Sequence, residues 1–592
     1  MFPPSPTTVC LSERLQAAAV LCCAGALLAL PWPAHAKLAP KVIQTQYSTK
    51  DVVIAATTVA PFPEKHRDAT KAIQAAIDEA AEAGGAVVFL EAGVFHLHSP
   101  LLIREGVTLR GDWLSPRIDA RVQGTVLAVN HGKDLLEGPP AITMERGTGI
   151  REVAIWYPDQ DVGAPAAYPW SIRFSPKRGG DNMTVLNVTM VNPYQAIKVG
   201  PESNELHTIQ NVFATPLLTG LSFDSTTDIG RVTNVTITPR IWEASGLSGA
   251  PAAPESSAAL RGWLKSKATA TDIGRSDWEY LYSLDVEGYA VGLEFRQGKR
   301  GTTNAVMLNC RLTDCKTALL LSKLNATGLA ATGCTFAGEQ ASIRAPETFR
   351  GAVAQFNTCT FAGTPATAVS LEGNGLLTLQ NCQFSSASEG TVTASAGDIS
   401  LINCDFPQAR MHISLGPDVR RARILSCRFE GGPKLVNSAT ACDSQISHHQ
   451  LDVPLPDISP HHPARIPTPS TSKLFSVTDC GASSDVPDNT AAFQQALDQA
   501  GEAGGTVYVP AGLYRFKGEI TVPTGVELRG IFDVPHHTMS GGSVLLPIAG
   551  RGAPDGTPFI QLQPNSGLRG LTVWYPEQDL KTFAPYPWTV RA

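Results

Sequence analysis

Two carboxylates flank a tryptophan near the middle of the chain, in Asp277-Trp278-Glu279. If this segment is a β-strand, Asp277 and Glu279 point to one side and Trp278 to the other. Cleavage of a glycosidic bond needs one acid to protonate the leaving oxygen and a second carboxylate as base or nucleophile. We therefore predict Asp277 and Glu279 as catalytic residues and Trp278 as a substrate contact. The alternative is a core tryptophan between two solvated acids.

A second acidic group comprises Asp224, Asp228, Arg231 and the pair Trp242-Glu243. Two carboxylates four residues apart in a turn beside an arginine can be held close enough to act together. In this interpretation Asp224, Asp228 and Glu243 are catalytic candidates, and Arg231 and Trp242 contact the substrate. The alternative is that the aspartates cap a turn and pair with Arg231.

Aromatic residues next to carboxyl and carboxamide groups form a third cluster. Its members, predicted as substrate contacts, are Trp156, Tyr157, Gln160, Tyr168 and Trp170. The apolar faces of sugar rings stack on indole and phenol rings, while Asp and Gln side chains bond hydroxyl groups. The cluster recurs near the end of the chain, so packing of a loop onto the fold is an equal alternative.

A sequence repeat of 22 to 25 residues predicts the strands that position these groups. Cysteines recur at this spacing, at Cys310, Cys334, Cys359, Cys382, Cys404 and Cys427. Two positions after them come Leu312, Phe336, Phe361, Phe384, Phe406 and Phe429. Residues two apart on a strand share a face, so both columns are predicted to be interior ladders of a parallel β-helix. A leucine-rich repeat would need leucines at fixed offsets, and these are missing.

Asparagines recur with a similar period, at Asn187, Asn211, Asn234, Asn309, Asn381 and Asn403. We interpret them as a turn ladder. An insertion at 244–272 interrupts the coil spacing and contains a predicted short helix near 258–267. Long excursions from a solenoid often line a functional site.

Nine cysteines follow residue 36. Side chains stacked in one column of parallel strands do not converge as a disulfide requires, so we expect the ladder cysteines to be buried free thiols. Cys315, Cys442 and Cys480 lie off the ladder, and pairing among them stays open. No metal site is predicted, because one column cannot supply a tetrahedral set of ligands and His96 and His98 have no third partner.

The opening of the first domain occurs twice. Both copies contain a helix with Asp-x-Thr at its start, then Gly-Gly, and both reach Gly-Val-x-Leu-Arg-Gly, at 106–111 and 525–530. We expect each helix to cap a β-helix end that would otherwise expose unpaired strands. The predicted organisation is a signal peptide at 1–36, a first β-helix at 37–451, a Pro-rich linker at 452–472, and the truncated start of a second β-helix at 473–592.

The N-terminus is typical of a secretory signal, with an apolar stretch before Ala34-His35-Ala36. We therefore expect a secreted or periplasmic protein with no membrane segment after cleavage. A net charge of −6 without a basic stripe argues against nucleic acid as a partner. A monomer is expected.

The Asp-x-Thr, Gly-Gly-x-Val and Gly-Val-x-Leu-Arg-Gly pattern resembles the pectate-lyase-3, or rhamnogalacturonase/epimerase-like, domain. The resemblance implies a right-handed single-stranded parallel β-helix. Two copies in one chain resemble the tandem arrangement of glycoside hydrolase family 55, whose members act on β-1,3-glucan. The segments around Trp156, Asp228 and Asp277 resemble bacterial family-28-related proteins, although the three-aspartate signature of family 28 is absent.

The leading hypothesis is a glycoside hydrolase that acts on a polysaccharide through paired carboxylates and needs no cofactor. One alternative is a polysaccharide lyase on uronate-containing glycans, with Arg231, Arg275 or Arg296 as the base and calcium as an aid. Another is a non-catalytic glycan-binding or surface protein.

Overall fold

The computed structural model describes residues 38–592 except 48, 50, 176–179, 364, 386, 388, 408, 441, 448–467, 537–540 and 580. The predicted signal peptide and most of the predicted linker lie outside the described residues. Residues Leu38–Ala592 form one compact unit. In the part of the chain that the structure describes, no helix has the length and apolar character needed to cross a membrane.

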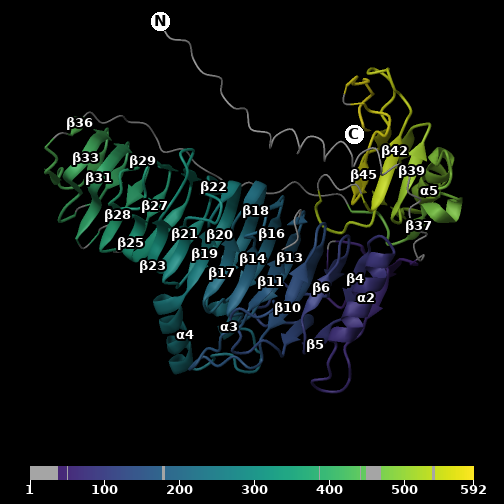
Figure 1. Cartoon of the computed structure of the whole chain (residues 1–592), viewed down its shortest axis with the longest axis horizontal. Helices are drawn as coiled ribbons and strands as arrows, with labels where there is room; N and C mark the ends of the chain where they lie inside the picture. Colours follow the sequence, from purple (N-terminus) through teal and green to yellow (C-terminus); the bar gives the residue numbers. More distant parts are fainter. Residues whose placement is uncertain are drawn as a thin grey trace, which may run out of the picture. The chain divides into compact units, whose positions relative to one another are not determined.

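Parallel strands stacked coil upon coil form most of the structure (Figure 1). One column contains β7 (Thr108–Arg110), β10 (Gly149–Trp156), β13 (Thr184–Met190), β16 (Thr208–Ala214), β18 (Thr226–Ile237) and β20 (Ser276–Glu287). A second contains β9 (Ile142–Met144), β11 (Trp170–Phe174), β14 (Gln195–Val199), β17 (Thr219–Phe223), β19 (Thr269–Ile273) and β21 (Val291–Phe295). Neighbouring strands in both columns pair in parallel. The predicted parallel β-helix is therefore confirmed, and its handedness stays a prediction.

The later coils contain the predicted interior ladders. Their longer strands are β23 (Arg311–Leu321), β25 (Thr335–Ala345), β31 (Gly390–Ile402) and β33 (Ile413–Leu425). The six ladder cysteines are buried. The rings of Phe361, Phe384 and Phe406 stack, with successive centroids 4.6 and 4.7 Å apart. Cysteines and phenylalanines thus pile up in columns inside the coils.

The asparagine ladder lies at a turn, as predicted. All six asparagines have a left-handed backbone, with φ between 50° and 56°. Asn403 Nδ2 donates to Asn381 Oδ1 at 2.8 Å, and Asn381 Nδ2 donates to Asn357 Oδ1 at 3.2 Å. Asparagine is one of the few residues that enters this backbone region readily, which explains its recurrence.

The nine cysteines that the structure describes are all free. The ladder thiols fill space as small apolar residues, as predicted. Cys315, Cys442 and Cys480 are also free, so the open alternative of a disulfide among them is not observed.

The two predicted helices have matching surroundings. They are α2 (Thr70–Glu82) and α5 (Thr490–Ala503). Gln74 exchanges two hydrogen bonds with the backbone of Leu102, and Gln494 does the same with Thr521. The second copy continues with parallel strands β38 (Gly505–Tyr508), β41 (Val526–Arg529) and β44 (Gly567–Arg569). The capping role and a complete second β-helix stay predictions.

The insertion contains helix α4 (Pro254–Lys267), and helix α3 (Arg240–Glu243) directly precedes it; both lie at one side of the strand stack (Figure 1). The predicted short helix therefore exists and begins earlier, at Pro254. Proline suits the first turn of a helix, because its missing N–H would have no partner there. Leu260 and Leu264 anchor α4 on the core.

A buried ionic cluster joins the two copies. Arg110 and Arg151 of the first copy have Arg529 and Arg569 as their equivalents in the second, because β7 pairs with β10 in the same register as β41 with β44. All four arginines lie within salt-bridge distance of Asp533, which is buried. All four also approach Asp51. We call this group the arginine cluster.

Candidate functional site

The structure separates the two acids of Asp277-Trp278-Glu279. Strand β20 contains all three residues, yet Asp277 is exposed and pairs with Arg275, whereas Glu279 is fully buried. Trp278 is 37% exposed. The prediction that Asp277 and Glu279 share one face is wrong. The pairing of β18 with β20 shifts register between Thr226 and Ile229, so simple alternation does not hold here.

Glu279 instead forms a buried pair with His207 inside the β-helix. His207 Nε2 lies 3.0 Å from Glu279 Oε1, and both side chains are inaccessible to solvent. Ser276 Oγ donates to Glu279 Oε2 at 3.0 Å. Gly230 lies between them, and a Cβ there would be 2.3 Å from His207 Cε1 and 2.4 Å from Glu279 Oε2. Glu279 therefore has no access to a substrate.

Asp224 and Asp228 also have different surroundings. Asp224 is buried and accepts the backbone N–H groups of Lys299 at 3.0 Å and Arg275 at 3.2 Å. Asp228 is exposed and accepts the N–H of the next residue. Asp224 thus holds loops together, and the joint action of these two acids stays a prediction. Arg231 is exposed on β18.

Trp242 and Glu243 attach the insertion to the coils. Trp242 is fully buried, so it cannot stack on a sugar. Glu243 accepts two hydrogen bonds from Arg261 of α4, at 2.9 and 2.7 Å. The predicted substrate contact of Trp242 is therefore wrong, and the catalytic role of Glu243 stays a prediction.

The Trp156 to Trp170 cluster packs a loop, which was the alternative interpretation. Tyr157 and Tyr168 are buried, with ring centroids 4.7 Å apart, and Trp156 is 9% exposed. Gln160 exchanges two hydrogen bonds of 2.9 Å with Ala166. Gln578 and Ala584 make the same pair of bonds in the second copy. These four side chains cannot reach a substrate.

Two predicted aromatic residues remain accessible. Trp170 is half-buried, with Lys198 Nζ 5.5 Å from its ring centroid. Trp278 lies beside Tyr280, with centroids 6.5 Å apart, and both rings are more than one-third exposed.

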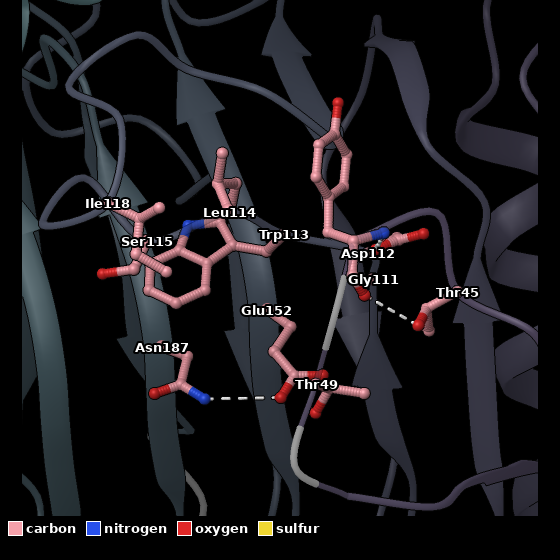
Figure 2. Close-up of a pocket in the computed structure, with 11 residues that line it drawn as sticks. Thr45, Thr49, Gly111, Asp112, Trp113, Leu114, Ser115, Ile118, Glu152 and Asn187 are labelled. Atoms are coloured by element: carbon pink, nitrogen blue, oxygen red, sulfur yellow. Dashed lines mark hydrogen bonds between the residues drawn. The ribbon is translucent and has the colours of Figure 1, made fainter.

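The residues missed by the sequence prediction line a pocket of about 140 Å³ at the start of the β-helix (Figure 2). Its lining residues are Thr45, Tyr47, Thr49, Gly111, Asp112, Trp113, Leu114, Ser115, Ile118, Glu152 and Asn187. The pocket thus combines two carboxylates, two aromatic rings, a carboxamide and several hydroxyl groups. That combination suits a sugar ring.

The β-helix coils bring the two carboxylates together. Asp112 follows β7, and Glu152 lies in β10, the next strand of the same column. Gly111 permits the close contact, since a Cβ there would be 2.5 Å from the carbonyl oxygen of Glu152. The N–H of Asp112 is held by Thr125 Oγ1 at 2.9 Å.

Glu152 occupies an unusual backbone position. Its φ is 60°, and it lies opposite Asn187, so it is the first member of the asparagine turn ladder. Asn187 Nδ2 donates to Glu152 Oε1 at 3.3 Å (Figure 2). A left-handed backbone costs an L-residue roughly 1–2 kcal/mol, and glutamate gains none of the local bonding that asparagine has there. Strained residues of this kind concentrate at functional sites.

The two carboxyl groups have different electrostatic surroundings. Burial raises the pKa of Asp112, and the nearby Glu152 charge adds to the rise, against N–H bonds from Gln46 and Tyr47. Glu152 accepts from Arg110 Nε at 2.6 Å and from an Arg151 Nη at 2.7 Å. Asp112 is thus suited to hold a proton, whereas Glu152 lies against two guanidinium groups.

The second copy lacks both acids. Asp112 corresponds to Ile531, and Glu152 corresponds to Gly570, whose φ is 64°. The backbone bonds around them are retained: Gly111 N donates to Arg151 O, and Gly530 N donates to Arg569 O. The fold therefore does not require these acids. A position-by-position comparison of the two copies is the sequence signal that would have identified them.

Among the described residues, no group of three or more His, Cys, Asp or Glu side chains is arranged to hold a metal ion. The absence of a cofactor stays a prediction.

Comparison with protein families supports the resemblance deduced from the repeats. Residues 63–230 and 474–535 match the model of the rhamnogalacturonase A/epimerase, pectate lyase-like family. Over these residues the chain is similar to that family. The likeness to the tandem arrangement of glycoside hydrolase family 55 stays a prediction. A comparison with curated proteins gave no match.

Several solved structures are similar. The A-module of mannuronan C-5 epimerase AlgE4 from Azotobacter vinelandii is 14% identical, with a TM-score of 0.42, over 65% of this chain and 98% of that one. An exopolygalacturonase from Thermotoga maritima is 11% identical, with a TM-score of 0.35, over 61% and 93%. PfbA, a surface adhesin of Streptococcus pneumoniae, is 10% identical, with a TM-score of 0.35, over 65% and 91%.

Proposed function

We propose that this protein is a carbohydrate-active enzyme that hydrolyses glycosidic bonds in the pocket formed by Asp112 and Glu152. The observation that carries the proposal is the meeting of two carboxylates, Asp112 and Glu152, in one pocket, with Glu152 in a left-handed turn that has asparagine, serine or threonine in later coils and glycine in the second copy. Glu152 also pairs with the buried Arg110 and Arg151, which hold it at this position in the pocket.

In this mechanism Asp112 is the acid and Glu152 is the second carboxylate. Asp112 donates its proton to the glycosidic oxygen as the bond to the leaving sugar breaks. Glu152 either activates a water molecule or attacks the anomeric carbon, and Arg110 and Arg151 hold it in place. Trp113 and Tyr47 provide rings for the sugar to stack on.

Replacement of the two acids tests this proposal. We expect Asp112→Asn and Glu152→Gln each to lower the hydrolysis rate by about 10²–10⁴-fold, the usual contribution of such a group. The measurement is reducing-sugar release from a panel of polysaccharides, with thermal unfolding as a check on folding. Asp277→Asn is the control, because that carboxylate is exposed and contacts only Arg275 among the ion pairs of the described residues. The proposal fails if Asp277→Asn abolishes hydrolysis while both pocket variants keep it.

The alternative of a uronate lyase has less support. It would use an arginine base, yet Arg275 pairs with Asp277 and Arg296 pairs with Asp272 at 2.5 Å. Product absorbance from an unsaturated uronate would identify a lyase. A protein that binds glycans but releases no product would instead be the non-catalytic surface protein.

The N-terminal sequence supports action outside the cytoplasm, in the medium or the periplasm. Sequencing of the exported protein, with Lys37 expected as its first residue, tests this location.

A further inference from the structure

Asp112 lies between two pockets. The first is the pocket of Figure 2, and the second is a larger one of about 420 Å³. The larger pocket is lined by Lys41, Val42, Ile43, Gln44, Gln46, Thr58, Phe89, Glu91, Ala92 and Asp112. Asp112 is the residue that the two pockets share.

The segment Gln44–Tyr47 is the wall between the pockets. Thr45, Tyr47 and Thr49 line the smaller pocket, whereas Gln44 and Gln46 line the larger one. Successive side chains of this segment thus line different pockets. The backbone N–H of Tyr47 donates to Asp112 Oδ1 at 3.1 Å, and that of Gln46 donates to Oδ2.

The wall is anchored at both ends. Strand β1 (Lys41–Ile43) pairs antiparallel with β2 (Val53–Ala55). Between them, Asp51 accepts from Arg569 at 2.7 Å and from Arg110 at 3.2 Å. The division into two pockets is therefore built into the fold.

Charge limits the kind of sugar that fits. Three carboxylates line the two pockets, those of Asp112, Glu152 and Glu91, and the cation that lines them is Lys41. Arg110 is buried and turned toward Glu152 and Asp533, so it is not available to a ligand. An acidic sugar would place its charge next to like charges, which costs several kcal/mol.

Size limits the number of sugar units. One water molecule needs roughly 10–15 Å³ of pocket volume, so the smaller pocket, at 140 Å³, holds on the order of ten non-hydrogen atoms. That is about one hexose unit. The larger pocket, at 420 Å³, has room for two or three units by the same measure.

We propose that the two pockets form one binding site for a neutral oligosaccharide, with one sugar unit in the smaller pocket, the following units in the larger pocket, and the segment Gln44–Tyr47 as the wall between them. The inference rests on the proposed function, because it places the bond to be cleaved beside Asp112. The exposed carboxamides of Gln44 and Gln46 are positioned to bond hydroxyl groups of the chain as it crosses the wall.

Calorimetric titration of the whole protein tests the proposal. The ligands are neutral gluco-, galacto- and manno-oligosaccharides, from monosaccharide to hexasaccharide, and galacturonate and mannuronate oligomers of equal length. We expect the affinity for one neutral series to rise from monosaccharide to trisaccharide and then level off. The matching uronates should bind at least about tenfold more weakly.

Two variants separate the pockets. Ala92→Trp fills the larger pocket and should reduce trisaccharide affinity to the monosaccharide value, without changing monosaccharide binding. Its matched control is Ala511→Trp, at the same position before the Gly-x-aromatic strand of the second copy. Gln44→Ala with Gln46→Ala alters exposed side chains, cannot disturb the core, and should weaken only the longer ligands.

The outcomes distinguish this inference from the proposed function. The two-pocket site is wrong if the affinity does not depend on the length of the oligosaccharide. It is also wrong if neither Ala92→Trp nor the double variant Gln44→Ala, Gln46→Ala changes the affinity. Neither result would contradict hydrolysis at Asp112. Uronates that bind as tightly as neutral sugars overturn the assignment of a neutral ligand. If no glycan binds, the proposed function itself fails.

Discussion

Single glycines decide where charged side chains meet inside this β-helix. His207 directly precedes β16 and Glu279 lies in β20, on the two sides of β18, and the two side chains reach each other past Gly230 because that residue has no Cβ. The pair lies among apolar residues, and the ring of His207 stacks on Phe223 with centroids 5.1 Å apart. A buried pair of this kind needs close contact, since an unpaired charge in the interior is costly.

We expect Gly230→Ala to destabilise the protein by about 1–3 kcal/mol, the usual cost of overpacking a filled core. The reason is that the added methyl group would lie 2.3 Å from His207 and 2.4 Å from Glu279. Urea denaturation measures the change. Gly262→Ala is the matched control, because it lies exposed in α4 with no atom within 4 Å of the added Cβ. That variant should be neutral or slightly more stable. Equal effects of the two variants would contradict this account of Gly230.

Among the elements, the turn between strands sets the position of each coil. The asparagines satisfy two requirements, because they adopt the left-handed backbone and pass hydrogen bonds from coil to coil. Glu152 also adopts the left-handed backbone, although that backbone is less favourable for glutamate than for asparagine, and it accepts a hydrogen bond from Asn187 of the next coil. The first coil of the ladder therefore gives up local stability for a carboxylate in the pocket, which agrees with a role in chemistry.

The two requirements can be separated at Asn381. Asn381→Ala loses both the side-chain bonds and the favourable backbone, whereas Asn381→Gly loses only the bonds. We expect the free energy of unfolding of the Asn381→Ala variant to be about 1–2 kcal/mol lower than that of the Asn381→Gly variant, because this is the cost of a left-handed backbone at an L-residue. Denaturation of both variants under one condition gives the difference. A more stable Ala variant would show that the turn conformation is not what selects asparagine.

At the scale of the whole molecule, the arginine cluster couples the two copies. Burial alone would raise the pKa of Asp533, but the charges of Arg110, Arg151, Arg529 and Arg569 outweigh burial and hold it well below its usual value. Asp51, Glu152 and Glu527 face the same arginines and supply the remaining negative charge. Removal of one member leaves buried arginines without a partner.

This arrangement predicts the response of the protein to acid. A carboxylate whose pKa is lowered on folding stabilises the protein above its unfolded pKa of about 3.9, and this stability is lost as the pH falls below that value. We expect Asp533→Asn to cost about 3–5 kcal/mol at pH 7 and to respond less to acid than the parent protein. Denaturation at neutral pH and near pH 3 measures both. Asp555→Asn, an exposed carboxylate of the second copy, should change neither. The prediction is wrong if the parent protein and the Asp533→Asn variant lose the same free energy of unfolding between neutral pH and the acidic pH.

The sequence by itself determined the coil period, the three ladders, the helices and the two copies, because each repeats a pattern that one strand or turn requires locally. Cys382, Phe384 and Asn381 are examples. Each occupies a position whose surroundings are the same from coil to coil, so the residue type recurs in the sequence. The sequence did not determine which acids meet. Asp277 and Glu279 are neighbours in the chain, but a register shift gives one to solvent and the other to His207. Asp112 and Glu152 lie in different coils, and only the stacking of β10 on β7 brings them to one pocket.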